Sequence, residues 1–314
     1  MEQSTSSPLF SILIPTWKRV QPVVQALDSI GQLAADTEVV IVDNGSEPCI
    51  FEELQSRVGS RPGVRLFRNE QNLGMVKNWN RCLELARGEW LGLLCSDDCY
   101  RPDAIRRLRK VVTAHPDPAL IIQDPAVEAG MVVSPAGSET VRDLRLPIAS
   151  GNFWHRSVYE AIGGFDERFE YSADGEYWYR AAFSFPVVKV REPFAEYLPH
   201  DDNYMWQTWR RPDYLQQSEL LARTVAGYVN SASPDRDAAI EGYVSMALWG
   251  TLLSILESTF LKQGKHDIFN CYFPKALRQA GNPGRAGQLL KALCAAAWRR
   301  VQELFKDSRG DVNG

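Results

Sequence analysis

The first hundred residues alternate between short runs rich in β-branched and aromatic residues and longer stretches with helical periodicity. Four of the runs are predicted strands: Phe10–Pro15, Glu38–Asp43, Val64–Asn69 and the run that starts at Trp90. The stretches between them are predicted helices: Pro22–Leu33, Ile50–Val58 and Lys77–Ala86. Short strands that alternate with helices are typical of a parallel sheet with crossover helices. The chain is therefore predicted to have an α/β fold built from βαβ units.

Polar residues follow each predicted strand, in the order Pro15-Thr16, Asp43-Asn44, Asn72-Leu73-Gly74 and Asp97-Asp98. The carboxyl ends of parallel strands meet at one edge of the sheet, where ligands of open α/β folds bind. Each polar end taken alone also fits a turn or a helix cap. Their coincidence at one edge favours a binding site.

The stretch Leu91 to Asp98 reads LGLLCSDD, an apolar run that ends in two adjacent carboxylates. Such a pair at a strand's end suits a divalent cation and a phosphate. Alternatively, the two acids form a turn before the helix predicted to begin near Asp103.

The chain continues with a mixture of elements that is harder to assign. A Pro- and Gly-punctuated stretch from Asp124 to Ser150 is predicted to be irregular or to contain a hairpin. The regular elements expected around it are helices Asp103–Ala114, Arg156–Ile162 and one from about Asp174, and strands Ala119–Gln123 and Val187–Pro193. Beyond about Asp201 the composition becomes helical.

Composition limits the class of protein. The net charge of -4 over 314 residues argues against nucleic acid as a partner. Six cysteines without a CxxC pair indicate reduced thiols in a cytoplasmic setting. The polar N-terminus does not resemble a signal peptide. The longest apolar window, Tyr243 to Leu256, is shorter than the roughly 20 residues that span a bilayer, so a buried helix is predicted.

Six motifs occur in an order that resembles family 2 glycosyltransferases of the GT-A fold: SILIPTWKR, VDNGS, NEQNLGMVKNWN, SDD, GGFDERF and SADGEYWYR. The resemblance runs from about Pro8 to His200. It implies a Rossmann-like nucleotide-diphospho-sugar transferase sheet, and the helical composition beyond it predicts a C-terminal helical extension. The predicted domains are a catalytic domain at 8–205, with a nucleotide-binding half at 8–100 and an acceptor half at 101–205, and a helical region at 206–314.

The resemblance implies an inverting transfer of a sugar from a nucleotide sugar to an acceptor hydroxyl, with UDP the commonest donor nucleotide and GDP and dTDP open. A divalent Mn²⁺ or Mg²⁺ would neutralise the leaving diphosphate. Its implied ligands are Asp97, Asp98 and His200. A surface or helix-capping role for His200 is the alternative.

Inversion by direct displacement requires a base beside the acceptor hydroxyl. The resemblance places Asp174 there, with Glu176 as competitor and a helix-capping role for Asp174 as the alternative. The helix dipole predicts a low pKa for Asp174. Trp154 and Glu176 are predicted acceptor contacts, although an aromatic such as Trp154 is more often core.

The predicted donor contacts follow the strands of the nucleotide-binding half. They are Pro15, Thr16, Arg19, Asp43, Asn72, Gly74, Lys77, Asn78, Ser96 and Asp97. Gly74 would allow the backbone to approach the base and phosphate closely. The alternative for Arg19 or Lys77 is a solvated cation on the surface. Two departures from the family pattern, Cys95 and Ala173 in place of acids, predict a weaker metal site.

From Lys275 to Arg309 the chain has eight basic and two acidic residues, a local charge of +6. Apolar residues keep helical spacing there, so a basic amphipathic helix on the inner face of the cell membrane is one expectation. The other is that it packs on the catalytic domain or on the second subunit of a homodimer. A membrane contact would suit assembly of cell-surface polysaccharide or a lipid-linked glycan acceptor. The competing functions are a nucleotidyltransferase, disfavoured because no Gly-rich basic loop follows the first strand, and a non-catalytic sugar-nucleotide-binding scaffold.

Overall fold

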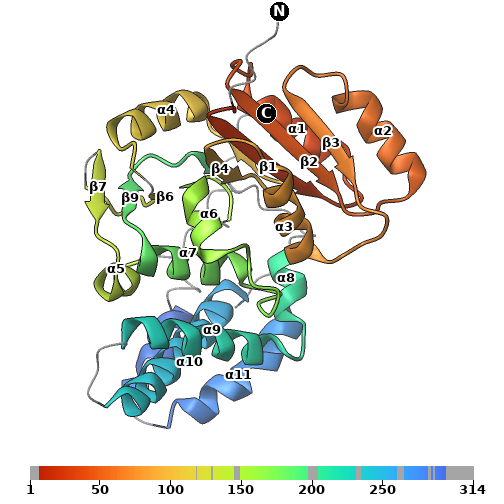
Figure 1. Cartoon of the computed structure of the whole chain (residues 1–314). Coiled ribbons are helices and arrows are strands. Elements are labelled where there is room, and N and C mark those ends of the chain that lie inside the picture. Colours follow the sequence, from red (N-terminus) through yellow and green to blue (C-terminus); the bar gives the residue numbers. More distant parts are fainter. Residues whose placement is uncertain are drawn as a thin grey trace, which may run out of the picture. The chain divides into compact units, whose positions relative to one another are not determined.

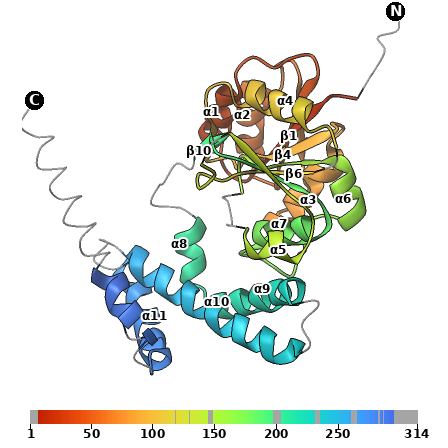
Figure 2. The same ribbon diagram turned by 90° about the vertical axis from the view of Figure 1, so that its left-hand side faces the viewer.

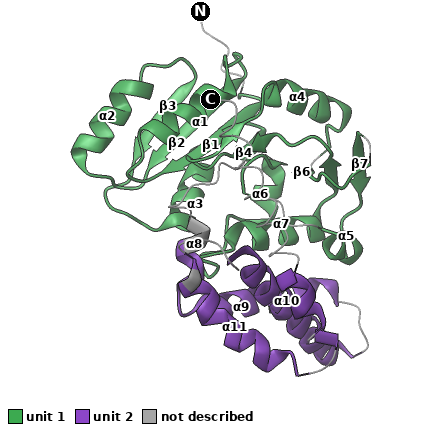
Figure 3. Ribbon diagram, turned by 180° about the vertical axis from the view of Figure 1, so that it is seen from behind, with its two compact units in different colours: residues 1–200 green, residues 201–314 purple. Residues whose placement is uncertain are grey.

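The computed structural model describes residues 7–117, 119–128, 130–144, 149–196, 204–230, 235–259, 265–281, 284–285 and 287–294. Contacts divide the chain into two compact units, residues 1–200 and residues 201–314, which Figure 3 colours separately. The first unit contains the sheet, and the described part of the second is helical. The predicted α/β sheet followed by a helical region is confirmed.

The N-terminal half of the first unit follows the predicted alternation. Its elements are β1 (Phe10–Thr16), α1 (Gln21–Ile30), β2 (Thr37–Asp43), α2 (Pro48–Val58), β3 (Val64–Arg68), α3 (Met75–Leu85) and β4 (Trp90–Leu93). The strands pair in parallel in the order β3-β2-β1-β4 (Figure 1). Their carboxyl ends therefore lie at one edge.

The second half of this unit extends the sheet to eight strands, in the order β3-β2-β1-β4-β8-β6-β9-β7. Its elements are β5 (Cys99–Tyr100), α4 (Ala104–Ala114), β6 (Leu120–Gln123), β7 (Met131–Ser134), α5 (Ser138–Arg142), β8 (Phe153–His155), α6 (Arg156–Ile162), α7 (Ala173–Ser184), β9 (Val187–Val190) and β10 (Ala195–Glu196). β8 runs antiparallel between β4 and β6, while β6 and β9 are parallel. β6 therefore points the same way as β4, so its carboxyl end lies at the same edge.

The sheet is covered on both faces. Alternate residues of β1 and β2, such as Ile12 and Ile41, join apolar side chains of α1, α2 and α4 in one buried cluster. On the other face α3 contacts β1 and β2, and α7 contacts β6. Burial on both faces explains why these strands read as continuous apolar runs.

The second unit contains α8 (Tyr204–Trp209), α9 (Tyr214–Val229), α10 (Arg236–Thr259) and α11 (His266–Gln279). α10 contacts both α9 and α11 (Figure 2). Its 24 residues extend beyond the predicted buried window on both sides, and by length and composition alone it could cross a membrane. Leu252, Ile255 and Leu256 are buried in the unit's own core, whereas Met246 is 66% exposed. The predicted buried helix is thus a longer helix that buries one side.

Candidate functional site

Arg19 and Asp97 connect the carboxyl ends of two neighbouring strands. Arg19 follows β1, Asp97 follows β4, and the Arg19 Nη1 atom lies 2.8 Å from Asp97 Oδ2. Both side chains are about one quarter to one third exposed, at 31% and 26%. The polar strand ends therefore meet at one edge, as the sequence predicts.

The other acid of the pair is held by a different loop. Asp98 is 6% exposed, and its Oδ2 accepts a hydrogen bond of 2.6 Å from the Ser150 hydroxyl. The same hydroxyl accepts the backbone N–H of Cys95 at 2.9 Å, and the intervening Ser96 is also buried. Ser150 therefore fixes the Cys95 to Asp98 turn from the loop before β8. Sequence reasoning missed Ser150, because nothing in its neighbourhood marks it from other loop serines.

Two carboxylates at this edge, those of Asp97 and Asp98, are candidate metal ligands. In the part of the chain that the structure describes, no group of three or more His, Cys, Asp or Glu side chains is arranged to hold a metal ion. The third predicted ligand, His200, lies outside the described residues.

Asp174 is the second residue of α7 and belongs to the same neighbourhood as the acid pair. The pKa of the Cys95 thiol is raised well above its ordinary value, first by burial and then by the negative charges of Asp98, Asp97 and Asp174. The charges of Asp97, Asp98 and Asp174 therefore all act on the Cys95 thiol.

The prediction of a low pKa for Asp174 needs correction. Burial raises the pKa of this carboxyl above its ordinary value, and the hydrogen bonds from the backbone N–H groups of Gly175 and of Asp174 itself only partly oppose the rise. The N-terminal position on α7 therefore does not compensate for the loss of solvent.

The turn after β2 occupies most of the hydrogen-bonding capacity of Asp43. This carboxylate is 1% exposed, accepts the backbone N–H of Ser46 at 2.9 Å and its hydroxyl, and lies 3.7 Å from Arg68 Nε. In this structure Asp43 shapes its own turn.

Four asparagines tie that turn to the loop between β3 and α3. Asn44 donates to Asn72 Oδ1 at 3.0 Å and to the Gly74 carbonyl at 3.1 Å. Asn69 donates to Asn44 Oδ1 at 3.0 Å and to Asn78 Oδ1 at 2.9 Å. Asn78 in turn donates to the carbonyl of Val42 at 3.1 Å. The predicted donor contacts Asn72 and Asn78 thus hold the loop in place.

Gly45, and not Gly74, lies close against another backbone segment of the protein. A Cβ atom on Gly45 would lie 2.4 Å from the backbone carbon of Gln71, whereas one on Gly74 would meet nothing within 4 Å. Gly74 has φ +88°, so its requirement for glycine is conformational.

The remaining predicted donor contacts differ in exposure. Pro15 and Thr16 are buried at the end of β1. Lys77 is half exposed and lies 3.7 Å from Glu167. Trp17, which the sequence analysis did not single out, is 45% exposed directly after β1. The Lys18 N–H donates to the Ser46 hydroxyl at 2.8 Å, which fixes this turn beside that of Asp43.

The two predicted acceptor contacts do not face solvent. Trp154 has no exposed surface, because β8 is buried between β4 and β6. The centroid of the Trp154 indole lies 5.3 Å from the ring centroid of Trp178 and 5.5 Å from that of Tyr177. Glu176 is 2% exposed and accepts two hydrogen bonds from Arg180, at 2.8 and 2.9 Å. Both residues stabilise the acceptor half and offer no surface to a sugar.

Residues 11–132 match the sequence model of Glycosyl transferase family 2. A chondroitin synthase of Escherichia coli is 36% identical over 99 residues, which are 31% of this chain and 14% of the synthase. A PGL/p-HBAD biosynthesis glycosyltransferase of Mycobacterium tuberculosis is 28% identical over 191 residues, 59% of this chain and 74% of that protein. An uncharacterized protein of the same species is 35% identical over 106 residues, 33% of each chain. Against its first curated relatives the chain spans a third or less of their length.

Two solved structures share the fold. S. aureus TarS 1-349 in complex with UDP-GlcNAc superimposes with a TM-score of 0.56 at 14% identity, covering 86% of this chain and 92% of that one. The mannosyltransferase PcManGT from Pyrobaculum calidifontis, in complex with GDP-Man and Mn²⁺, superimposes with a TM-score of 0.50 at 16% identity. The superposition covers 95% of this chain and 88% of that one. The fold is that of the GT-A glycosyltransferases. The match over residues 11–132 supports the resemblance to glycosyl transferase family 2 that the sequence predicts, and the predicted fold is confirmed.

Proposed function

We propose that this protein transfers a sugar from a nucleotide sugar to an acceptor hydroxyl with inversion at the anomeric carbon. The observation that carries the proposal is the ion pair between Arg19 and Asp97, 2.8 Å long, at the sheet edge. It joins a cation suited to phosphate oxygens and a carboxylate suited to a divalent ion, the two groups that a nucleoside diphosphate requires.

The carboxylate groups of Asp97 and Asp98 suit a hard divalent cation. Carboxylate oxygens are the ligands that Mn²⁺ and Mg²⁺ prefer, and such ions keep positions for water and phosphate oxygens. Asp97 would hold the ion, and Asp98 would contribute from the position that Ser150 fixes. When bound, the ion neutralises charge on the departing diphosphate. Cys95 adds no hard oxygen ligand, which supports a site of moderate affinity.

Donor binding would rearrange the pair. Arg19 would leave Asp97 and donate to oxygens of the diphosphate, since guanidinium groups bind phosphate bidentately. The exposed indole of Trp17 would stack on the base, because base–aromatic stacking needs only an accessible ring face. Asp43 and the four asparagines would act by holding the shape of the two turns on which the nucleotide lies.

Asp174 would act as the base. As the acceptor oxygen bonds to the anomeric carbon, its proton moves to the Asp174 carboxylate and the bond from that carbon to the diphosphate breaks. A carboxyl whose pKa is raised by burial is a better proton acceptor than an ordinary aspartate once it is ionised.

The donor is proposed to be UDP-linked, and the setting to be assembly of a cell-surface polysaccharide or a lipid-linked glycan at the cytoplasmic side of the membrane. The bound UDP-GlcNAc of the TarS structure and the names of two relatives, a chondroitin synthase and a PGL/p-HBAD biosynthesis glycosyltransferase, support this choice.

The test is a thermal-shift panel of UDP, GDP and dTDP sugars, each with and without Mn²⁺. One nucleotide sugar is expected to stabilise the protein by about 2.7 kcal/mol at a hundredfold excess over its Kd, and more strongly with Mn²⁺. Asp97→Asn should abolish the shift, whereas Asp28→Asn, on the exposed surface of α1, should retain it. The donor assignment fails if no nucleotide sugar shifts the wild-type protein.

A further inference from the structure

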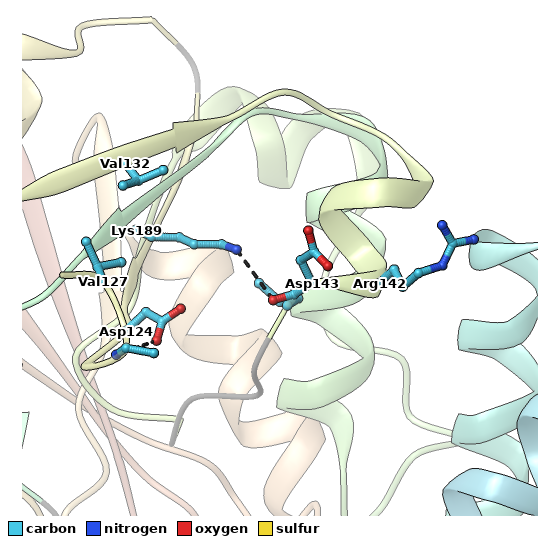
Figure 4. A pocket seen from close by; sticks show the side chains of 8 residues that line it. Asp124, Val127, Val132, Arg142, Asp143 and Lys189 are labelled. Atoms are coloured by element: carbon cyan, nitrogen blue, oxygen red, sulfur yellow. Dashed lines mark hydrogen bonds between the residues drawn. The ribbon is translucent and has the colours of Figure 1, made fainter.

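A pocket of about 470 Å³ lies in the acceptor half of the first unit, beside the ends of β6 and β9 and the end of α5 (Figure 4). Val127, Val132 and Leu144 form its apolar walls. Its charged lining residues are two acids and two bases, Asp124, Asp143, Arg142 and Lys189. Pockets of this size accommodate a small ligand such as a sugar ring. None of the residues assigned above to donor binding lines it.

Lys189 enters this pocket from the sheet. It lies in β9 opposite Ile122 of β6 and Val132 of β7, and its neighbours Val188 and Val190 face the buried cluster on the other side. Figure 4 shows its side chain extending across the pocket toward the backbone of Asp143.

The ammonium group of Lys189 is poorly compensated. The residue is 9% exposed, and its Nζ atom donates to the Asp143 carbonyl at 3.4 Å. Within the described ranges no carboxylate forms an ion pair with it. Burying a charge costs free energy unless an opposite charge or strong hydrogen bonds accompany it. An anion that enters the pocket would therefore supply the opposite charge that this ammonium group lacks.

The pocket is connected to the acid pair through two residues. Gln123, the last residue of β6, donates to the Ser150 carbonyl at 3.1 Å, and the Ser150 hydroxyl donates to Asp98. Asp124 comes next in the chain, and its Oδ1 accepts the Ala126 N–H at 3.0 Å. The pocket and the acid pair thus share the carboxyl edge of the sheet, as donor and acceptor subsites would.

We propose that this pocket binds an anionic group of the acceptor, a carboxylate or a phosphate, with Lys189 as its counter-ion. Asp124 accepts a hydrogen bond from a neighbouring hydroxyl of the same ligand, and the apolar walls contact its ring. This inference rests on the proposed glycosyl transfer and specifies the acceptor as an acidic sugar or a phosphate-linked one.

The first experiment measures binding of inorganic phosphate and of glucuronate to the full chain by calorimetry, in EDTA, at low and high salt. Saturable binding of at least one probe, weakened by salt, is expected. Lys189→Met should weaken it about tenfold or more, because a hydrogen bond to a charged group is lost. Lys189→Arg should retain it. Lys110→Met removes an exposed lysine of α4, on the opposite face of the sheet, and should change nothing.

A second set of variants separates this inference from the donor site. Asp97→Asn should lose the thermal shift with nucleotide sugar and keep anion binding. Lys189→Met should keep the thermal shift and weaken anion binding. Phosphate binding without glucuronate binding supports a phosphate-bearing acceptor, and the converse supports a uronic acid. The proposal is overturned if wild-type protein binds neither probe, or if Arg19→Met abolishes binding that Lys189→Met leaves intact.

Discussion

Asp174 is a residue at which stability and function are in conflict. Its carboxyl is partly buried, which raises its pKa, yet a base must be ionised at neutral pH. Asp174→Asn is therefore expected to lose turnover by about a hundredfold or more while donor binding persists. Steady-state kinetics and the nucleotide-sugar thermal shift measure the two effects. Unchanged turnover would remove Asp174 as the base, and lost turnover with donor binding intact would exclude the scaffold function.

The same substitution makes a prediction about pH. A carboxyl whose folded-state pKa lies above its unfolded value binds a proton more tightly in the folded protein, so stability falls as pH rises through the folded pKa. Asparagine carries no such proton. In EDTA, Asp174→Asn should match the wild-type melting temperature in acid and exceed it at neutral pH. A difference in melting temperature that is independent of pH would contradict a partly buried carboxyl with a raised pKa.

Gly45 makes a second residue-scale prediction. Its φ of +70° and the 2.4 Å that would separate a Cβ from the backbone of Gln71 both oppose a side chain. Gly45→Ala should destabilise the protein by roughly 2–4 kcal/mol. Gly130→Ala shares the positive φ, at +63°, but its Cβ meets nothing within 4 Å, so about 1 kcal/mol is expected. Urea unfolding measures the free energy of unfolding of both variants. Equal losses of stability would show that the contact with Gln71 is unimportant.

Residue identity predicted the location of the site better than the role of each side chain. The strand ends that carry Arg19 and Asp97 lie at one edge, as the sequence predicts, because the carboxyl ends of parallel strands are adjacent whatever follows them. Asn72, Asn78 and Asp43 are engaged in hydrogen bonds within the turns. Their partners come from loops far apart in the sequence, and that pairing leaves no local pattern.

α7 shows how one ion pair can anchor an element. The carboxylate of Glu176 receives Nε and Nη2 of Arg180 one turn later, and Arg180 also donates to the carbonyls of Ile162 and Gly164. The helix that carries Asp174 is thereby fixed to the turn that ends α6. Because Glu176 is buried, removing its charge leaves the guanidinium without its carboxylate.

Glu176→Gln is therefore expected to lower the free energy of unfolding by about 2–4 kcal/mol. The matched control is Glu167→Gln, whose partner Lys77 lies 3.7 Å away with both side chains about half exposed, so a change below about 0.5 kcal/mol is expected. Denaturant unfolding measures both. A small effect of Glu176→Gln on stability together with a raised acceptor KM would instead restore the acceptor role predicted from the sequence.

Strand length decided which elements the sequence revealed. β1 and β2, with seven residues each, give apolar runs long enough to recognise. β8 has three residues, Phe153–His155, and its strand identity comes from antiparallel pairing with β4 and β6. Propensity within three residues cannot signal that pairing, so the sequence leaves both an acceptor contact and a core position open for Trp154.

At the scale of the whole molecule, the second unit combines apolar and basic side chains on its surface. Leu277 and Leu290 are 52% and 64% exposed, and each is followed in the chain by a basic residue, Arg278 and Lys291, that is also exposed. The basic residues of the predicted amphipathic helix from Arg299 onward lie outside the described residues. Paired apolar and basic groups suit an anionic lipid surface.

The full-length protein is therefore expected to float with vesicles that contain anionic lipid, less at high salt, and not with neutral vesicles. Each positive charge near the surface contributes about 1 kcal/mol, so Arg278→Gln and Lys291→Gln should each weaken binding about fivefold. Lys110→Gln, on α4 of the first unit, serves as the charge control. Flotation that depends on neither salt nor these residues would exclude this surface as the membrane contact, and its absence at low salt would favour packing of the basic segment on protein.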